Sequence, residues 1–140
     1  MIDQLNRRTA LQTLAGGLLL RSAAPAAEIQ DAVLSRDDGR LDAQPFGDLR
    51  VFLQGQTVGL KSLTFGSLEL KPGQSPHAPH QHAEEEIMLI TEGHGEITLS
   101  GKVSKVGPGS IMYADSNHVH GIVNTSDAPL TFYYFKWIGK

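Results

Sequence analysis

Short apolar runs alternate with turn residues along most of the chain after residue 48. Brief apolar segments separated by Gly, Pro, Asn and Asp are typical of β-strands joined by tight turns. We expect strands at residues 49–53, 58–60, 63–70, 87–91, 96–99, 103–106, 110–113, 119–123 and 130–137. Strands this short, linked by hairpins, predict an all-β antiparallel barrel or sandwich.

The last expected strand, residues 130–137, is rich in aromatic residues and other strand formers. Successive side chains of a strand face opposite sides of the sheet. We therefore expect one set to pack in the core. The other set, on the exposed face, is a candidate contact for a second copy of the chain.

The first 26 residues have the pattern of an export signal. Arg7 and Arg8 precede an apolar run at residues 14–20, and Ala24-Pro25-Ala26 supplies a small-residue cleavage site. The run is shorter than the roughly 20 residues of a membrane span, so we expect no stable span after removal of the signal. A core helix is the alternative, which the paired arginines disfavour. The pair resembles the twin-arginine signals of bacteria, and we predict an exported protein, periplasmic or secreted.

The chain is expected to divide into three segments. Residues 1–26 form the signal, residues 27–48 a polar N-terminal arm with a short helix or an ordered loop, and residues 49–140 the barrel domain. A total of 140 residues allows one domain with a modest core.

Charge and cysteine content exclude several classes of function. The chain has 12 Lys and Arg against 15 Asp and Glu, a formal net charge of −3. Cleavage after Ala26 removes three basic residues and one acidic residue, which leaves nine against 14 and a charge of −5. This balance disfavours a nucleic-acid partner, which requires a basic face. The chain has no cysteine, so disulfides and zinc–thiolate sites are excluded and any metal ligands must be imidazole or oxygen.

All six histidines lie between positions 77 and 120. On a strand, His80 and His82 face the same side, and Glu86 has the same parity. His120 lies in another strand and completes the set if the two hairpins fold together. Three imidazoles and one carboxylate suit a divalent first-row ion such as Mn, Fe, Ni, Cu or Zn and leave coordination positions open for a ligand.

This spacing resembles the two sequence motifs of the cupin family, which are small β-barrels of the jelly-roll type. The first motif has His-x-His, then Glu, then a glycine six residues later, and His80, His82, Glu86 and Gly93 match it. The second motif has a glycine, a Pro-x-Gly turn, a histidine and an asparagine. Its matching positions here are Gly109, His120 and Asn124.

The match has three departures. Gly73 stands one residue further before His80 than usual, Asp115 replaces the family proline, and Asn117 replaces the glycine. Asn tolerates the left-handed backbone conformation better than most residues, so we expect the turn to form. None of these changes touches a ligand position.

The resemblance implies that His80, His82, Glu86 and His120 hold one divalent transition metal ion. His118 is a rival of His120, but only His120 keeps the family spacing to Asn124. Other residues are expected to serve different roles. His77 and His118 are expected at the rim or behind the ligands, and His94 at a solvated hairpin tip. Glu86 could instead be one of three surface acids with Glu84 and Glu85, and only its six-residue step to Gly93 singles it out.

Two functions fit these features. The first is a metal-dependent enzyme, by resemblance a dioxygenase or related oxidoreductase, that acts on a small oxygen-bearing organic molecule in a pocket lined by alternate residues of 87–90, Met112, and Phe132 or Tyr134. The second is a binding module without turnover. A general acid or base near the ion would favour the enzyme, and the candidates are Glu84, Glu85, His77 and Tyr113. The resemblance also implies a homodimer.

Overall fold

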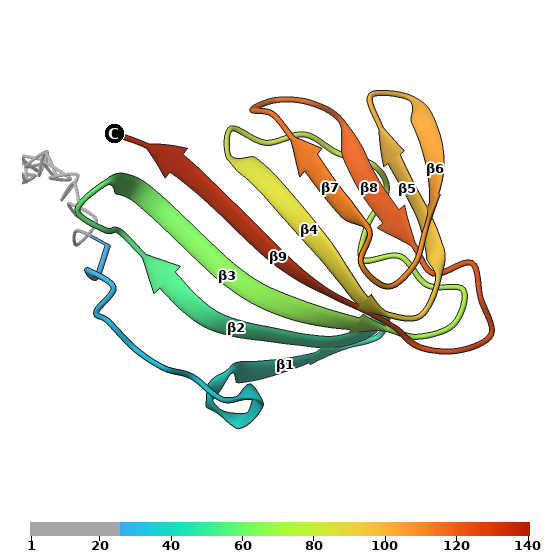
Figure 1. The fold of residues 1–140 in the computed structure, drawn as a ribbon, viewed down its shortest axis with the longest axis horizontal. Coiled ribbons are helices and arrows are strands. Elements are labelled where there is room, and N and C mark those ends of the chain that lie inside the picture. Colours follow the sequence, from blue (N-terminus) through green and yellow to red (C-terminus); the bar gives the residue numbers. More distant parts are fainter. Residues whose placement is uncertain (1–25) are drawn as a thin grey trace, which may run out of the picture.

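The computed structural model describes residues 26–140, which form two antiparallel sheets (Figure 1). The strands are β1 (Arg40–Gln44), β2 (Gly47–Gly55), β3 (Leu60–Leu70), β4 (Glu85–Glu92), β5 (Gly95–Leu99), β6 (Lys102–Val106), β7 (Ile111–Ala114), β8 (His120–Val123) and β9 (Leu130–Gly139). The larger sheet has the order β1-β2-β3-β9-β4-β7, and the smaller has the order β6-β5-β8. The expected all-β antiparallel fold is therefore confirmed.

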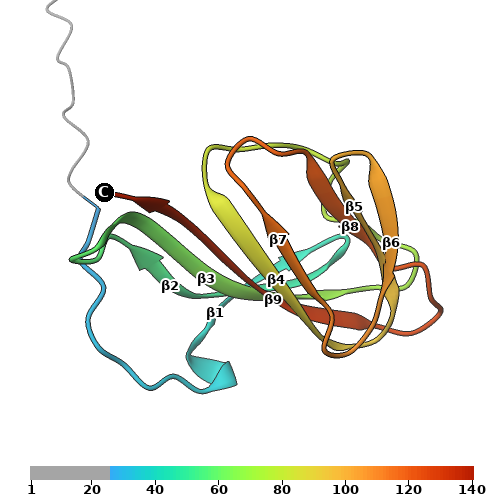
Figure 2. The ribbon, with the colours of Figure 1, turned by 45° about the horizontal axis from the view of Figure 1, so that its top comes forward.

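The smaller sheet covers the part of the curved larger sheet that contains β4 and β7 (Figure 2). Strands β1 and β2 lie at the opposite edge of the larger sheet. Alternate side chains of the covered strands point into the space between the two sheets. The core comes from both sheets and consists of Leu68, Leu70, Met88, Ile90, Ile97, Met112, Ala114, Ile122, Leu130 and Phe132. The arrangement is two packed antiparallel sheets with the core between them.

One expected strand is wrong. Residues 58–60 do not form a strand of their own, because Thr57 closes a tight turn onto the first residue of β3. Its backbone N–H donates to Leu60 O over 3.1 Å, and its hydroxyl oxygen accepts from Leu60 N over 3.0 Å. The expected strand at 63–70 accordingly begins earlier, at Leu60.

The polar segment before the barrel is partly built into the larger sheet. A short 3₁₀ turn, η1 (Arg36–Asp38), precedes β1, and Asp38 accepts hydrogen bonds from the backbone and hydroxyl of Ser35. Strand β1 then pairs with β2. Both β1 and the start of β2 fall on the arm side of the boundary expected between residues 48 and 49, and that division stays a prediction.

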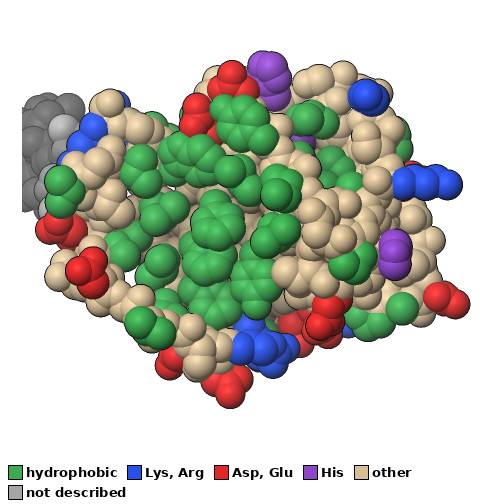
Figure 3. All heavy atoms as spheres, viewed as in Figure 1, with side chains coloured by type: hydrophobic (Ala, Val, Ile, Leu, Met, Phe, Trp, Pro, Cys, Tyr) green, Lys and Arg blue, Asp and Glu red, His purple; other side chains and the backbone are tan. Residues whose placement is uncertain are grey.

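The outer face of the larger sheet carries an aromatic stack, which we define as Phe52, Phe65, Tyr133 and Phe135. Phe65 stacks on Phe135 with ring centroids 4.3 Å apart, and on Phe52 at 5.5 Å. Apolar side chains gather over β2, β3, β9 and β4 on this face (Figure 3). Because these strands also supply the core, both sides of the same sheet are apolar.

The expected export signal lies outside the described residues except for Ala26. Between residues 26 and 140, no helix has the length and apolar character needed to cross a membrane.

Candidate metal centre

Backbone pairing brings the two histidine segments together. The backbone N–H of His80 donates to His120 O over 2.9 Å, and the N–H of His120 donates back to His80 O over 2.8 Å. The two residues form an isolated antiparallel bridge next to the start of β8. This bridge explains how a residue far along the chain reaches the His-x-His segment.

A second set of bonds fixes the loop before His120. The N–H of Asn117 donates to His82 O over 2.8 Å, and the hydroxyl of Ser116 donates to Ala83 O over 2.8 Å. Asn117 has φ 60°, in the left-handed region where the family pattern has glycine. The expectation that asparagine supports this turn is confirmed.

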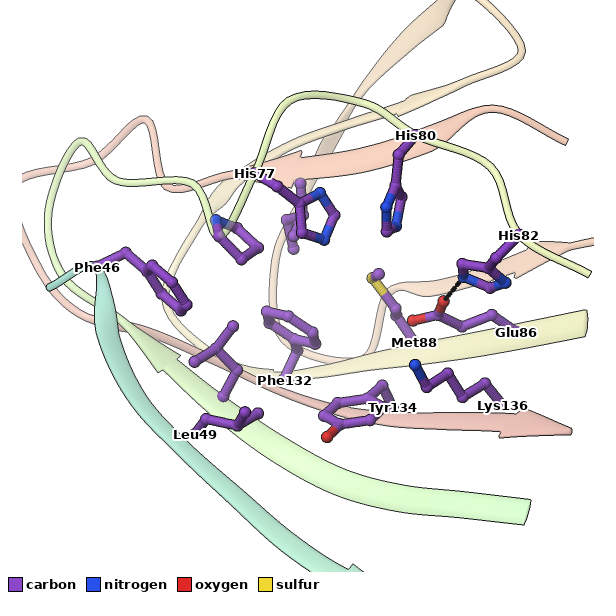
Figure 4. A pocket seen from close by; sticks show the side chains of 13 residues that line it. Phe46, Leu49, His77, His80, His82, Glu86, Met88, Phe132, Tyr134 and Lys136 are labelled. Carbon is purple, nitrogen blue, oxygen red and sulfur yellow. Dashed lines mark hydrogen bonds and ion pairs between the residues drawn. The ribbon is translucent and has the colours of Figure 1, made fainter. Parts of the chain in front are cut away.

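The side chains of three expected ligands, His80, His82 and His120, form one group, and the fourth, Glu86, contacts two of them. One ligand atom from each of His80, His82 and His120 lies within 4.8 Å of the others. Glu86 Oε2 lies 2.9 Å from His82 Nε2 and 3.0 Å from His120 Nε2 (Figure 4). Ligand atoms that share one first-row ion at about 2.0–2.2 Å lie about 3 Å apart, so these separations suit a common ion.

The far sides of two imidazole rings show which nitrogen is available to a metal ion. His82 Nδ1 donates to the backbone carbonyl of Glu84 over 3.1 Å, and His120 Nδ1 donates to that of His118 over 2.8 Å. A carbonyl only accepts, so each Nδ1 carries hydrogen and each Nε2 faces Glu86. In the metal-free protein a protonated ring donates from Nε2 to the Glu86 carboxylate, whereas a neutral ring presents its Nε2 lone pair to a metal ion at the same place. The residues present therefore fit a metal ion.

Burial and hydrogen bonds set the charge of the centre. Burial opposes ionisation of Glu86, but the hydrogen bonds and charges of His120 and His82 outweigh it, so the pKa of Glu86 lies below its ordinary value. The hydrogen bond that His120 donates to the Glu86 carboxylate raises the pKa of His120 despite burial. Burial, followed by the neighbouring imidazoles, lowers the pKa of His80, which favours the neutral, metal-binding form.

A cavity of about 230 Å³ opens beside the centre. One half is polar, with His77, His80, His82, Glu86 and Lys136, and the other half is apolar (Figure 4). The apolar half consists of Phe46, Leu49, Leu68, Pro76, Met88, Ile122, Phe132 and Tyr134.

The expected lining is partly right. Phe132 and Tyr134 both border the cavity, and Met88 does so from the expected strand at 87–91. Met112 does not, because it is only 4% exposed and packs in the core.

The other histidines take separate positions. His77 borders the cavity at the rim, and its ring centroid lies 3.7 Å from that of His80. The side chain of His118 is exposed, and the residue acts through its carbonyl, which orients His120. His94 is exposed, as expected for a hairpin position.

Of the four candidate acid–base residues, only His77 borders the cavity. Glu85 and Tyr113 have the outward parity of their strands, and Tyr113 is 51% exposed. The Glu84 carboxylate lies 3.2 Å from His82 Nδ1, on the far side of that ring. Glu84 therefore positions a ligand instead of facing the cavity.

Two residues that border the cavity, Lys136 and Phe46, were not predicted from the sequence. Lys136 shares its inward parity with Phe132 and Tyr134, so the alternation within the last strand was the signal that marks it. Phe46 lies between β1 and β2, in the polar segment, and no periodicity indicated its position.

With the geometry established, comparison with known proteins gives the family. The model of the cupin domain family matches residues 66–136, which contain all four expected ligands. The chain belongs to the cupin family. The resemblance inferred from the two motifs is thus confirmed.

Individual cupins show how far the similarity extends. The oxalate-binding protein of Thermotoga maritima is 30% identical over 80 residues, which are 57% of this chain and 66% of that protein. A cupin of the RmlC-like type from Shewanella frigidimarina superposes with a TM-score of 0.65 at 12% identity, over 79% of this chain and 94% of the other. A predicted oxalate decarboxylase from Thermotoga maritima superposes with a TM-score of 0.61 at 21% identity, over 76% and 99% of the two chains. These structures share the fold.

Proposed function

We propose that this cupin binds one divalent transition metal ion through His80, His82, Glu86 and His120, and beside it a small oxygen-bearing organic molecule. The observation that carries the proposal is the convergence of two Nε2 atoms on Glu86 Oε2, at 2.9 and 3.0 Å, with both Nδ1 atoms tied to carbonyls. The cavity next to these atoms supplies the ligand site. The printed name of the oxalate-binding relative supports a small, oxygen-rich ligand.

When bound, a divalent ion would act as a Lewis acid toward the ligand's oxygen atoms, and a redox-active ion would also support reactions with dioxygen. The chain's own residues have other tasks. Glu84 and His118 hold two imidazoles in the orientation that presents Nε2. Phe132 and Met88 exclude water from the inner side of the cavity, because both are almost fully buried.

A second candidate function is turnover, as in a metal-dependent dioxygenase or related oxidoreductase. His77 favours it, because its exposed imidazole borders the cavity and lies against His80. Its Nδ1 donates to the carbonyl of Ala78 over 2.9 Å, so Nε2 is the nitrogen that can accept a proton from a bound molecule. A binding module without turnover has the same site but transfers no proton from the bound molecule to His77.

Metal content tests the binding proposal. Protein stripped with a chelator and dialysed separately against Mn, Fe, Ni, Cu and Zn salts should retain one ion per chain of at least one metal, measured by inductively coupled plasma mass spectrometry. The His80→Ala/His82→Ala variant should retain none. The matched control replaces two exposed histidines, His94→Ala/His118→Ala, and should retain the full content. Full occupancy in the first double variant would show that the ligand assignment is wrong.

Oxygen consumption separates the two functions. The metal-loaded protein is mixed with small phenols, diketones and carboxylates, and dioxygen uptake is followed with an electrode. Uptake that falls in His77→Phe, with unchanged metal content, supports turnover and the proton-accepting role of His77. A stoichiometric redox-active ion with no uptake on any compound supports the binding module.

We propose that two copies associate through the outer face of the larger sheet. On this face Ile111 is 68% exposed, Tyr113 51% and Phe135 36%, and all three belong to β7 or β9. Large contiguous apolar patches on a protein surface mark contact sites. Strand β7 is also an edge of the sheet, and a second copy presents the same surface, as a two-fold symmetric interface requires.

Export by the twin-arginine route is a further proposal, supported by the pattern of residues 1–26 alone. The Arg7-Arg8→Lys-Lys variant of the full chain should accumulate in the cytoplasm of a bacterial host, while the unchanged chain reaches the periplasm. Equal export of both would contradict this route.

A further inference from the structure

Among the residues that the structure describes, Lys136 is the one lysine or arginine that borders the cavity. It lies directly opposite Glu86 in the pairing of β9 with β4, and both side chains point inward. In Figure 4 its side chain runs along the cavity floor with the amine directed toward the region of Glu86. A strongly hydrated ammonium group at such a position costs desolvation unless an anion lies nearby.

Glu86 lies opposite Lys136 but forms no ion pair with it within 4.0 Å, and Glu86 Oε2 contacts His82 and His120. Among residues 26–140 the structure shows no ion pair between Lys136 and any carboxylate. Within the described part of the chain, Glu86 is also the one acid that borders the cavity. A divalent ion, Lys136 and Glu86 together would carry a net charge of +2 in a partly enclosed space, because the imidazoles bind metal as neutral rings.

The rest of the cavity is apolar. Phe46, Leu49 and Phe132 line the half away from the histidines, and burial raises the pKa of Tyr134 and keeps its phenol neutral. The cavity of about 230 Å³ is smaller than the 300–1,000 Å³ typical of drug-sized ligands. A ligand that suits both halves is small, carries negative charge at one end, and has a short hydrocarbon or aromatic portion.

We propose that Lys136 is an anion-recognising residue that selects small organic carboxylates for this site. The inference rests on the proposed function, because the carboxylate lies between Lys136 and the metal centre while its carbon skeleton contacts the apolar half. Lys136 is thus a specificity-determining residue, and the ligand class is narrower than oxygen-bearing molecules in general.

The test uses metal-loaded protein and four matched probe pairs: acetate and acetamide, pyruvate and pyruvamide, malonate and malonamide, benzoate and benzamide. Each amide keeps the shape of its acid and removes the charge. Affinities are measured by isothermal titration calorimetry for the unchanged chain, Lys136→Met, Lys136→Arg and the control Lys105→Met. Lys105 is exposed on β6, so its replacement changes the net charge equally without touching the cavity. Metal content is measured before and after each titration.

At least one carboxylate should bind the unchanged chain more tightly than its amide. Loss of a charge-assisted hydrogen bond should weaken that carboxylate roughly 10- to 100-fold in Lys136→Met. The amide should bind equally in both proteins, Lys136→Arg should restore most of the affinity, and Lys105→Met should behave as the unchanged chain.

The two proposals fail differently. A chain that retains no metal refutes the proposed function and this inference with it. A chain that retains one ion but prefers the amides, binds no carboxylate, or binds carboxylates equally well in Lys136→Met refutes the role of Lys136 alone.

Discussion

The two faces of the six-stranded sheet use alternate residues of the same strands for different purposes. On β4, Glu86, Met88 and Ile90 face inward and are at most 6% exposed, while Ile87 and Leu89 face outward and are half-buried. On β9, the inward residues Phe132, Tyr134 and Lys136 border the cavity, and the outward residues Tyr133 and Phe135 belong to the aromatic stack. Both faces are apolar, so hydrophobicity alone does not show which one contains the site.

What separates the faces is the placement of polar groups. The inner face combines an apolar wall with Glu86 and Lys136. Burying either charge in a core costs free energy unless the charge is paired. The outer face carries stacked aromatic rings of Phe52, Phe65 and Phe135. The inner face is therefore suited to an ion and a charged small molecule, and the outer face to a second protein surface.

The largest difference between the faces should appear in folding stability. Ile90→Ala removes a side chain that is 1% exposed in the core and should lower the free energy of unfolding by about 2–5 kcal/mol. Ile87→Ala makes the same change three positions earlier on the outward side and should cost clearly less. Urea unfolding at a concentration where the chain is monomeric measures both. Equal losses would contradict the assignment of the faces.

The next largest effect should be the increase in the free energy of unfolding when the metal ion binds on the inner face. At a free ion concentration 100 times the dissociation constant, the ion should raise the free energy of unfolding by about 2.7 kcal/mol. His120→Ala should abolish this increment, and His94→Ala should keep it. Each protein is unfolded in urea with the ion and with chelator, so that the difference isolates the contribution of the ion. An increment that survives in His120→Ala would place the ion elsewhere.

A charge on the outer face should affect association more than folding. Phe135→Lys disrupts the stacking on Phe65, whose centroid lies 4.3 Å away, and should lower the monomer's free energy of unfolding by about 1 kcal/mol. Sedimentation equilibrium should show a dimer for the unchanged chain and a monomer for the variant. Metal content should not change. A variant that associates as strongly as the unchanged chain would remove the outer face as the dimer contact.

The smallest effect should be a pH dependence of the metal-free centre. The lowered pKa of Glu86 stabilises the fold above the ordinary carboxyl pKa of 4.5, and this contribution is lost as pH falls through the lowered value. The raised pKa of His120 stabilises the fold below 6.5, and this contribution is lost as pH rises through the raised value.

The difference in unfolding free energy between the unchanged chain and Glu86→Gln should therefore be greatest between about pH 4.5 and 6.5. Urea titrations in chelator across pH 3.5–9 measure it. A difference that is flat with pH would show that the Glu86–His120 pair does not carry this charge coupling.

The sequence allowed the barrel and the convergent residues to be predicted because both depend on local spacing. Short apolar runs located most strands. Glu86 lies in β4, but His80 and His82 lie in the segment before it and not on a strand, so the parity argument for these two histidines was wrong. His120 required the family motif, since its bridge to His80 spans forty residues and nothing local encodes it.

Other features depend on contacts between distant segments. Phe46 reaches the cavity from the polar segment before β2, and Met112 packs in the core although its parity matched a lining position. The turn at Thr57 depends on a hydroxyl that accepts from Leu60, a bond that apolar patterning does not register. The alternation within the last strand predicts that Lys136 faces inward. That Glu86 lies opposite Lys136 follows only from the pairing of β9 with β4, which the sequence does not show.

The location of the bound ion tests the central claim most directly. Crystals of metal-loaded protein, measured at the absorption edge of the retained metal, should give one anomalous peak per chain. The peak should lie about 2.0–2.2 Å from an imidazole nitrogen of His80, from Nε2 of His82 and His120, and from a carboxylate oxygen of Glu86. A fully occupied peak at His77, His94 or His118, with none among these four side chains, would contradict the account.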